Sequence, residues 1–155
     1  MRSIDGGLLV QQDDKELETS GDIVTNVKFP ENVQNSVAFG VATCKTLKSN
    51  AITIVRQNED GSLQLLGAGM GNPNRIISLQ QAVEKAKENG FDNLSDALLV
   101  SDAFFPFDDG VKMAASYGIK YVVQPGGSIK DNLVIETANS LEMGMLMTRV
   151  RHFNH

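Results

Sequence analysis

The sequence predicts an α/β fold with a mostly parallel sheet, and two observations lead to that fold class. Between residues 97 and 148, short apolar runs alternate with longer stretches of helical spacing. A strand–helix–strand–helix–strand order of this kind predicts parallel strands joined by right-handed crossovers. The chain has 155 residues, 41% apolar and 21% charged, which fits one domain with a substantial core. We therefore expect one domain over residues 1–155, with an irregular lead-in at 1–30 and an α/β core at 31–155.

The first third of the chain has the weaker patterns. Residues 6–10 are a candidate short strand, and residues 11–22 are polar and acidic. Pro30 ends an extended segment, because a proline disfavours helical angles in the residue before it. Residues 31–47 carry apolar side chains at a spacing that suits a helix, although several β-branched residues weaken the pattern.

A hairpin and a series of regular elements follow. Residues 51–55 are apolar and β-branched, and a turn containing Asp60 and Gly61 separates them from the apolar run 63–66, which predicts a β-hairpin. Residues 78–89 have helical spacing and close on Gly90, a good C-cap. Beyond this helix we expect strands at 97–100, 120–124 and 145–148, and helices at 109–117 and 132–142.

The loops that follow the strands of such a sheet are the expected place for ligands. Three phenylalanines fall within residues 104–107. They either pack inward or form the wall of a pocket for a flat heterocycle, in which Asp102 and Asp109 would accept hydrogen bonds from ring N–H or amino groups. Asp109 is also a suitable N-cap for the next helix.

The loop at 124–131 has two interpretations. Gly126 and Gly127 let backbone N–H groups converge on an acceptor, just before a helix N-terminus. Ser128 and Asp131 also have the spacing of a capping box. The sequence leaves both interpretations open.

Two further segments have a functional and an ordinary interpretation. Residues 67–75 join a strand to a helix, which suggests a nucleotide loop. The spacing of their glycines matches neither the dinucleotide motif nor the P-loop. A flexible connector is the alternative. The tail at 148–155 holds two arginines, two histidines and a phenylalanine. Arginine suits a phosphate, whereas many chain ends are frayed.

Composition excludes several classes of protein. The net charge of -5 and the lack of a basic run argue against nucleic-acid and acidic-membrane partners. The apolar runs are too short to cross a bilayer. Cys44, the only cysteine, lies in an apolar stretch and is expected to be a buried small hydrophobe instead of a reactive thiol. The motif of zinc deaminases is absent from the sequence, and we expect a reducing, cytoplasmic environment.

Six strings spread over almost the whole chain resemble AICAR transformylases. SDAFFPF at 101–107 and QPGGSI at 124–129 are the most specific of them. The others are GGLLVQ at 6–11, the lysines, serine and asparagine within 45–52, GAG at 67–69 with Arg75, and RHF-x-H at 151–155.

The resemblance implies a cytidine-deaminase-like, three-layer α/β/α fold without zinc. It also implies transfer of a formyl group from 10-formyltetrahydrofolate, the cosubstrate, to the 5-amino group of AICAR. That amine is a poor nucleophile, so the site must remove its proton and stabilise an oxyanion. The implied partners are AICAR, a folate, and either further copies of the chain, in a dimer or other homo-oligomer, or the missing transformylase subdomain.

The resemblance also implies roles for individual residues. Asn50 and His155 correspond to catalytic positions beside the reaction centre. Ser49 and Asp102 correspond to positions that help to hold a monovalent cation such as potassium. The positions implied to bind substrate or folate are Arg75, Ile76, Phe104, Phe107, Asp109, Ser128 and Arg151, the last facing the nucleotide phosphate.

The chain departs from the family pattern at important places. A lysine–histidine pair central to catalysis belongs to an earlier subdomain in the family, in a string like Val-Lys-His-Thr-Asn-Pro-Cys-Gly, and this sequence has no such string. The loop after Gly69 is two residues longer. We therefore expect the C-terminal part of a transformylase, incomplete as an isolated chain. The alternatives are a non-catalytic folate- or purine-nucleotide-binding module and an oligomerisation domain whose aromatic loop packs against its twin.

Overall fold

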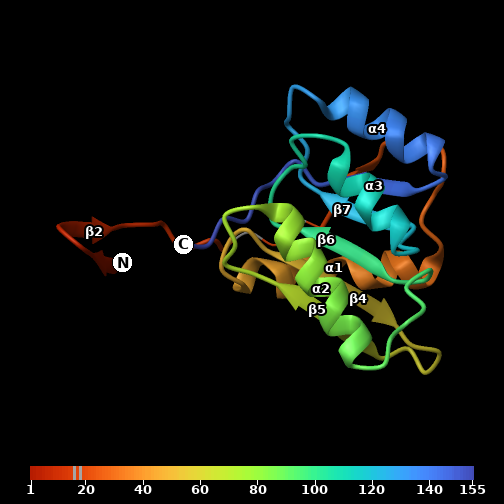
Figure 1. Ribbon diagram of the computed structural model, residues 1–155, viewed down its shortest axis with the longest axis horizontal. Helices are drawn as coiled ribbons and strands as arrows, with labels where there is room; N and C mark the ends of the chain where they lie inside the picture. The colour runs from red at the N-terminus through yellow and green to blue at the C-terminus, as the bar shows by residue number, and fades with distance from the viewer. Residues whose placement is uncertain (16, 18) are drawn as a thin grey trace.

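A six-stranded sheet with helices on both faces forms the body of the protein (Figure 1). The computed structural model describes residues 1–15, 17 and 19–155, so two residues of the acidic segment predicted at 11–22 lie outside it. The strands lie in the order β3-β8-β7-β6-β4-β5. Their bounds are β3 Asp22–Ile23, β4 Ile52–Gln57, β5 Leu63–Gly69, β6 Leu98–Ser101, β7 Tyr121–Gln124 and β8 Gly144–Met147, and the helices are α1 Glu31–Thr46, α2 Arg75–Glu88, α3 Asp109–Ser116 and α4 Asp131–Ser140.

The predicted parallel unit is confirmed in the second half of the chain. β6 pairs in parallel with β7, and β7 in parallel with β8. α3 and α4 provide the two crossovers between these strands. The predicted helices and strands of this half all occur, with ends that differ by one or two residues.

The sheet as a whole is mixed, which corrects the prediction of a mostly parallel sheet. β4 pairs antiparallel with both β5 and β6, and β3 pairs antiparallel with β8. The turn at 58–61 reverses the chain, and α2 then carries it from β5 across β4 to β6. β5 and β6 therefore run in the same direction, with β4 placed between them in the opposite direction.

The predicted strand at 6–10 occurs as half of a small hairpin. β1 (Arg2–Ile4) pairs antiparallel with β2 (Gly7–Leu9) through a two-residue turn at Asp5 and Gly6. Gly6 has a φ of 76°, which suits that turn. This hairpin extends away from the body of the protein (Figure 1).

Two apolar cores, one on each face of the sheet, hold the layers together. One lies between the sheet and α2, α3 and α4, and the other lies between the sheet and α1. Cys44 belongs to the second core, where its Sγ lies 3.5 Å from the carbonyl oxygens of Ala51 and Val100. Burial raises the pKa of this thiol well above its ordinary value, so the prediction of a buried small hydrophobe is confirmed.

Glycines in β5 allow α2 to pack directly on the sheet. A Cβ added at Gly67 would lie 2.0 Å from the carbonyl oxygen of Ala82, and one added at Gly69 would lie 1.9 Å from that of Ser78. The nucleotide-loop interpretation of residues 67–75 is thus unnecessary for these two glycines, because both belong to a strand in contact with a helix.

Replacing Gly67 with Ala is expected to lower the free energy of unfolding by about 1–3 kcal/mol, because the helix must shift away from the strand. Urea unfolding measures this change. Gly7→Ala is the matched control, since an added Cβ there meets nothing within 4 Å. Equal stability of the two variants would contradict the importance of this contact.

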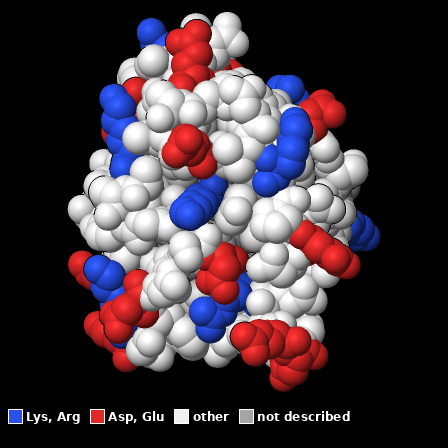
Figure 2. Space-filling view, turned by 90° about the vertical axis from the view of Figure 1, so that its right-hand side faces the viewer, with Lys and Arg blue, Asp and Glu red and all other residues white. Residues whose placement is uncertain are grey.

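The surface shows no dominant charge on the side that Figure 2 presents. Acidic and basic side chains are interspersed there, without a continuous stripe of either sign (Figure 2). Within the described part of the chain, every helix is too short or too polar to cross a membrane.

Candidate functional site

The loops predicted to bind ligands meet at one edge of the sheet. β5, β6, β7 and β8 end at this edge and β4 begins there, because β4 runs antiparallel to its neighbours. Hydrogen bonds join the segments that gather at the edge. The Gly71 N–H donates to the Lys48 carbonyl at 2.7 Å, that of Asp102 to the Ala51 carbonyl at 3.2 Å, and that of His152 to the Asp102 carbonyl at 2.9 Å.

Asp102 is the buried charge at the centre of this edge. Its side chain is 0% exposed. Its Oδ1 accepts a hydrogen bond from Arg75 Nη2 at 3.1 Å, and its Oδ2 accepts one from the Ser49 hydroxyl at 2.6 Å. A buried carboxylate is stable only when it is paired and hydrogen-bonded, and Asp102 meets both conditions.

Arg75 reaches this carboxylate from the first residue of α2. The Asn74 Oδ1 accepts a hydrogen bond from the Ile76 N–H at 2.8 Å and caps the helix, which therefore begins three residues before its predicted start. The guanidinium also donates from Nη2 to Asn50 Oδ1 at 2.8 Å and from Nη1 to the Phe104 carbonyl at 3.0 Å. Its Nε is buried and has no hydrogen-bond partner among the described residues.

The Asn50 side chain is held at both ends of its amide. Oδ1 accepts from Arg75, and Nδ2 donates to the Asn72 carbonyl at 2.9 Å. The Asn50 carbonyl accepts from the Ser78 hydroxyl at 2.7 Å, and the peptide bond between Ser49 and Asn50 is cis. Asn72 and Ser78 were not among the predicted site residues. The longer loop after Gly69 was the only signal for Asn72, and Ser78 was predicted only as the first residue of a helix.

A pocket of about 420 Å³, which we call the arginine pocket, opens beside this network. It brings together five residues that the resemblance implied, from the segment before β4, the start of α2 and the segment that leads into α3. These are Asn50, Arg75, Ile76, Phe107 and Asp109, and Pro73, Asn74, Phe105 and Pro106 complete the lining.

The aromatic loop combines both of its predicted roles. Phe105 is 1% exposed and packs into the core, whereas Phe107 is 56% exposed and lines the arginine pocket. Phe104 contributes its backbone carbonyl to Arg75, and its ring is not part of the pocket lining. Inward packing therefore describes Phe105, which also contributes to the pocket lining, and the exposed pocket wall is Phe107.

Asp109 is the first residue of α3, so its prediction as the N-cap is wrong by one position. The N-cap is Asp108, and Asp109 Oδ1 accepts from the N–H of Gly110 at 2.8 Å. Asp108 instead joins α3 to α4, because it accepts hydrogen bonds from Lys112 Nζ at 2.8 Å and Thr137 Oγ1 at 3.0 Å. The hydrogen bond from Lys112, followed by that from Thr137, lowers the pKa of Asp108.

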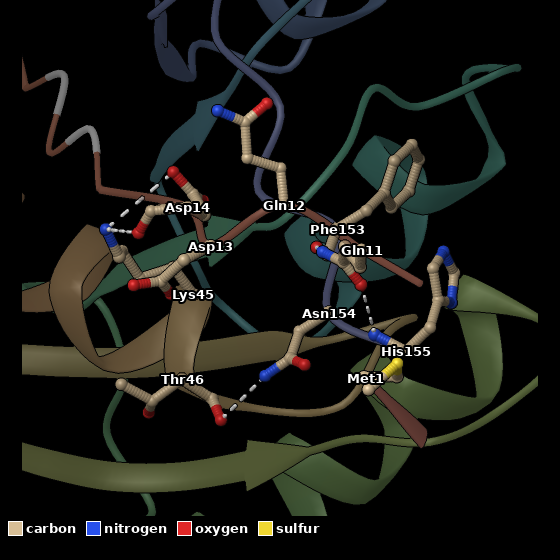
Figure 3. A pocket seen from close by; sticks show the side chains of 10 residues that line it. All are labelled: Met1, Gln11, Gln12, Asp13, Asp14, Lys45, Thr46, Phe153, Asn154 and His155. Carbon is tan, nitrogen blue, oxygen red and sulfur yellow. Dashed lines mark hydrogen bonds and ion pairs between the residues drawn. The ribbon is translucent and has the colours of Figure 1, made fainter. Parts of the chain in front are cut away.

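A second pocket, the tail pocket, also of about 420 Å³, lies between the lead-in and the C-terminal tail (Figure 3). Gln11 Nε2 donates to the Phe153 carbonyl, and Gln11 Oε1 accepts from the His155 N–H at 3.2 Å. The rings of Phe153 and His155 are stacked, with centroids 5.8 Å apart. The tail is thus hydrogen-bonded to the lead-in. The pocket is lined by Met1, Gln11, Gln12, Asp13, Asp14, Lys45, Thr46, Phe153, Asn154 and His155.

Hydrogen bonds connect a segment that reaches the arginine pocket with the tail. The Ser49 N–H donates to the Asn154 carbonyl at 2.8 Å, and the Asn154 N–H donates to the Ser49 hydroxyl at 3.1 Å. Asn50 follows Ser49 and lines the arginine pocket, whereas His155 follows Asn154 and lines the tail pocket. The two residues implied to be catalytic are therefore each one position from this hydrogen-bonded pair.

A buried histidine that sequence reasoning missed also fastens the tail. The His152 side chain is 6% exposed, and its Nδ1 lies 2.7 Å from Asp14 Oδ2. Its Nε2 is buried without a hydrogen-bond partner in the described part of the chain. The two residues are 138 positions apart, so no local sequence pattern could predict their contact.

Ser128 and Arg151 lie outside the lining of both pockets. The N–H groups of Gly127 and Ser128 converge on the Asp131 carboxylate at 2.8 and 3.0 Å, so the acceptor is a side chain of the loop itself. The Ser128 hydroxyl accepts from the Lys130 N–H, which makes the capping box only partly formed. Arg151 is exposed, with its guanidinium carbon 5.7 Å from the centre of the Phe153 ring.

Ser49 and Asp102, the two residues implied to help to hold a monovalent cation, are in direct contact. The Ser49 hydroxyl donates to Asp102 Oδ2 at 2.6 Å. The Arg75 guanidinium balances the charge of the carboxylate. Among the residues that the structure describes, no group of three or more His, Cys, Asp or Glu side chains is arranged to hold a metal ion.

A mixed sheet covered by helices on both faces places this protein in the α/β class. Within that class the chain belongs to the AICARFT/IMPCHase bienzyme family, whose model matches residues 1–85.

Relatives of known name extend the similarity over the whole chain. The bifunctional purine biosynthesis protein PurH of Petrotoga mobilis is 42% identical over 153 residues, which cover 99% of this chain and 28% of the relative. Those of Lacticaseibacillus casei and Clostridioides difficile are 44% and 43% identical over 155 residues, covering 99% and 100% of this chain and 29% of each relative. The chain thus spans less than a third of the length of these relatives.

Proposed function

We propose that this chain is the C-terminal part of a formyltransferase domain of purine synthesis. Together with the rest of the longer protein, it would transfer the formyl group of 10-formyltetrahydrofolate to the 5-amino group of AICAR. Membership of the AICARFT/IMPCHase family and similarity to the bifunctional PurH proteins support this role.

The observation that carries the proposal is the pair of hydrogen bonds between Ser49 and Asn154, which connects a segment reaching the arginine pocket with the tail. A group transfer needs two substrates whose reacting atoms meet within about 3–3.5 Å. We infer that the reacting atoms of ligands in the two pockets meet near this pair. We assign the folate to the arginine pocket, where Phe107 offers an aromatic face and Asp109 an acceptor. We assign AICAR to the tail pocket, whose Phe153 lies next to the Arg151 guanidinium.

The reaction requires an oxyanion donor and proton transfer. The amine nitrogen attacks the formyl carbon, an oxyanion forms, and the bond from that carbon to N10 of the folate breaks. The amine loses a proton and N10 gains one. Asn50 Nδ2 has two hydrogens, of which one binds Asn72, and the other is the donor that we assign to the oxyanion. His155 is the titratable group that we assign to the proton transfer on this chain.

The isolated 155-residue protein is expected to bind ligands with little or no turnover, because the lysine–histidine pair of the family is absent from its sequence. Calorimetric titration with AICAR and with 10-formyltetrahydrofolate measures binding, and a formylation assay measures turnover. Adding the preceding transformylase segment of a PurH relative should restore turnover. Appreciable turnover by the chain alone would contradict this assignment.

The same experiments distinguish two other functions from the proposed one. Tight binding that never leads to turnover, even with the added segment, would favour a non-catalytic folate- or nucleotide-binding module. Failure to bind either ligand, together with loss of an oligomer in Phe107→Ala, would favour an oligomerisation domain. The 56% exposure of Phe107 at the arginine pocket supports assembly with a further copy or with the missing segment. We also propose a cytidine-deaminase-like fold and a cytoplasmic location, by resemblance.

A further inference from the structure

Asn72 lies in the β5–α2 loop, and it contacts Asn50 through its backbone. Its carbonyl oxygen accepts hydrogen bonds from the Asn50 backbone N–H at 3.2 Å and from Asn50 Nδ2 at 2.9 Å. Together with the bond from Gly71 to Lys48, these bonds make residues 71–72 an additional strand-like partner of residues 48–50. One carbonyl thus restrains both the backbone and the side chain of Asn50.

The side chain of Asn72 fixes that carbonyl in place. Its Nδ2 lies 2.7 Å from Gln81 Oε1, 3.1 Å from Ser78 Oγ and 3.2 Å from the Met70 carbonyl oxygen. Gln81 and Ser78 belong to α2, so the loop is tied to a rigid helix. Ser78 is 0% exposed, and its hydroxyl also donates to the Asn50 carbonyl.

The opposite end of the Asn50 amide is held by Arg75, whose Nη2 donates to Oδ1. An amide with a donor on its oxygen and an acceptor on its nitrogen has one orientation, because a flip would face like groups against each other. A proton donor at the oxygen also polarises the amide and strengthens its remaining N–H as a donor.

We propose that Asn72 and Ser78 are positioning residues of the formyltransferase site, which set the orientation of the Asn50 amide before any ligand binds. The hydrogen bonds above support the positioning of the Asn50 amide. The role of that positioning in formyl transfer rests on the proposed function. Neither residue lines the arginine pocket. Both act through Asn50.

The first test follows the Asn50 side chain directly and needs no ligand. ¹⁵N relaxation of the Asn50 side-chain amide, assigned with the help of Asn50→Ala, is measured in the 155-residue protein. We expect an ordered amide in the wild type and an order parameter below about 0.6 in Asn72→Ala and Ser78→Ala. An Asn50 amide as ordered in both variants as in the wild type would overturn the inference.

The matched control is Asn58→Ala. Asn58 is also a half-buried loop asparagine, and its Nδ2 donates to Ser62 and Gln64 at 3.0 and 3.2 Å. It lies in the β4–β5 turn, at the other edge of the sheet. We expect the Asn50 amide of Asn58→Ala to remain as ordered as in the wild type. Equal loss of order in this control would mean that the effect is general loosening, and would also overturn the inference.

The second test measures the consequence for binding by calorimetry with 10-formyltetrahydrofolate. We expect Asn72→Ala to weaken binding about tenfold, the effect of losing roughly one well-placed hydrogen bond to the ligand. In an Asn50→Ala background the same change should weaken binding less than about twofold, since residues that act through one another are not additive. A tenfold effect in both backgrounds would show that Asn72 acts independently of Asn50.

The two tests separate the inference from the proposed function. If Asn50→Ala weakens binding and Asn72→Ala does not, the inference fails and the proposed function stands. If the wild type binds neither 10-formyltetrahydrofolate nor AICAR, the proposed function fails, and the relaxation measurement still decides whether Asn72 positions Asn50.

Discussion

Replacing Asp102 with Ala is expected to lower the free energy of unfolding by about 3–5 kcal/mol. The Asp102 carboxylate is fully buried and accepts hydrogen bonds from Arg75 and Ser49. Its removal leaves a guanidinium that is only 12% exposed without a countercharge. Breaking a buried ion pair from one side costs this much because the remaining charge stays desolvated. Urea unfolding of the two proteins measures the difference.

Asp96→Ala is the matched control for that experiment. Asp96 lies 3.8 Å from Arg56, and its side chain is 48% exposed, so the pair is screened by solvent. A surface pair of this kind contributes about 0–1 kcal/mol. The double variant Asp102→Ala with Arg75→Met should recover part of the lost stability, because it removes the unpaired charge. A loss in Asp102→Ala no larger than that in Asp96→Ala would mean that Asp102 is not the electrostatic centre of the edge.

Local patterns in the sequence were sufficient to locate most of the regular structure. The helix predicted at 31–47 and the strands predicted at 97–100 and 120–124 lie within one or two residues of α1, β6 and β7. The two strands are short apolar runs, and Pro30 and Pro125 mark the start of α1 and the end of β7. The start of α2 was missed because its cap is Asn74, which precedes the first apolar residues of the helix pattern.

Such patterns did not predict every neighbour of every strand. The hairpin signal fixed β4 beside β5, but nothing in the sequence of β4 indicates that β6 lies on its other side. That pairing depends on the crossover of α2, which is a property of the whole chain. The β1 strand was missed although Asp5 and Gly6 form a two-residue hairpin turn of a recognised type.

The site was predictable as a set of residues, and its internal contacts were not. The resemblance brought Asn50, Arg75 and Asp102 into one region, and the structure joins them by hydrogen bonds. Asn72 lies in the longer loop after Gly69 and belongs to none of the strings that carried the resemblance. The bond between His152 and Asp14 links two segments with no local signal. Contacts of this kind depend on three-dimensional packing.

Replacing Arg75 with Lys is expected to weaken the binding of 10-formyltetrahydrofolate about a hundredfold. The guanidinium donates to Asn50, Asp102 and Phe104 from two nitrogens held in one plane. A lysine ammonium has one nitrogen on a flexible side chain, so it cannot reproduce the planar arrangement of donors of the guanidinium. Loss of two charge-assisted hydrogen bonds releases the Asn50 amide and the wall of the arginine pocket, and each such bond contributes about 1.5–3 kcal/mol. A tenfold change in affinity corresponds to about 1.4 kcal/mol.

The lysine substitution separates geometry from charge. It keeps the positive charge that balances Asp102, so the attraction of the site for an anionic folate is little changed. The affinity of Arg75→Lys for 10-formyltetrahydrofolate, measured by calorimetric titration, therefore reports the effect of the arrangement of the guanidinium donors. Arg56→Lys is the control, because Arg56 lies at the other edge of the sheet, where its guanidinium is 3.8 Å from Asp96 and 5.2 Å from the centre of the Phe91 ring. Unchanged affinity in Arg75→Lys would mean that Arg75 acts as a charge alone, and that the orientation of Asn50 does not determine how the folate binds.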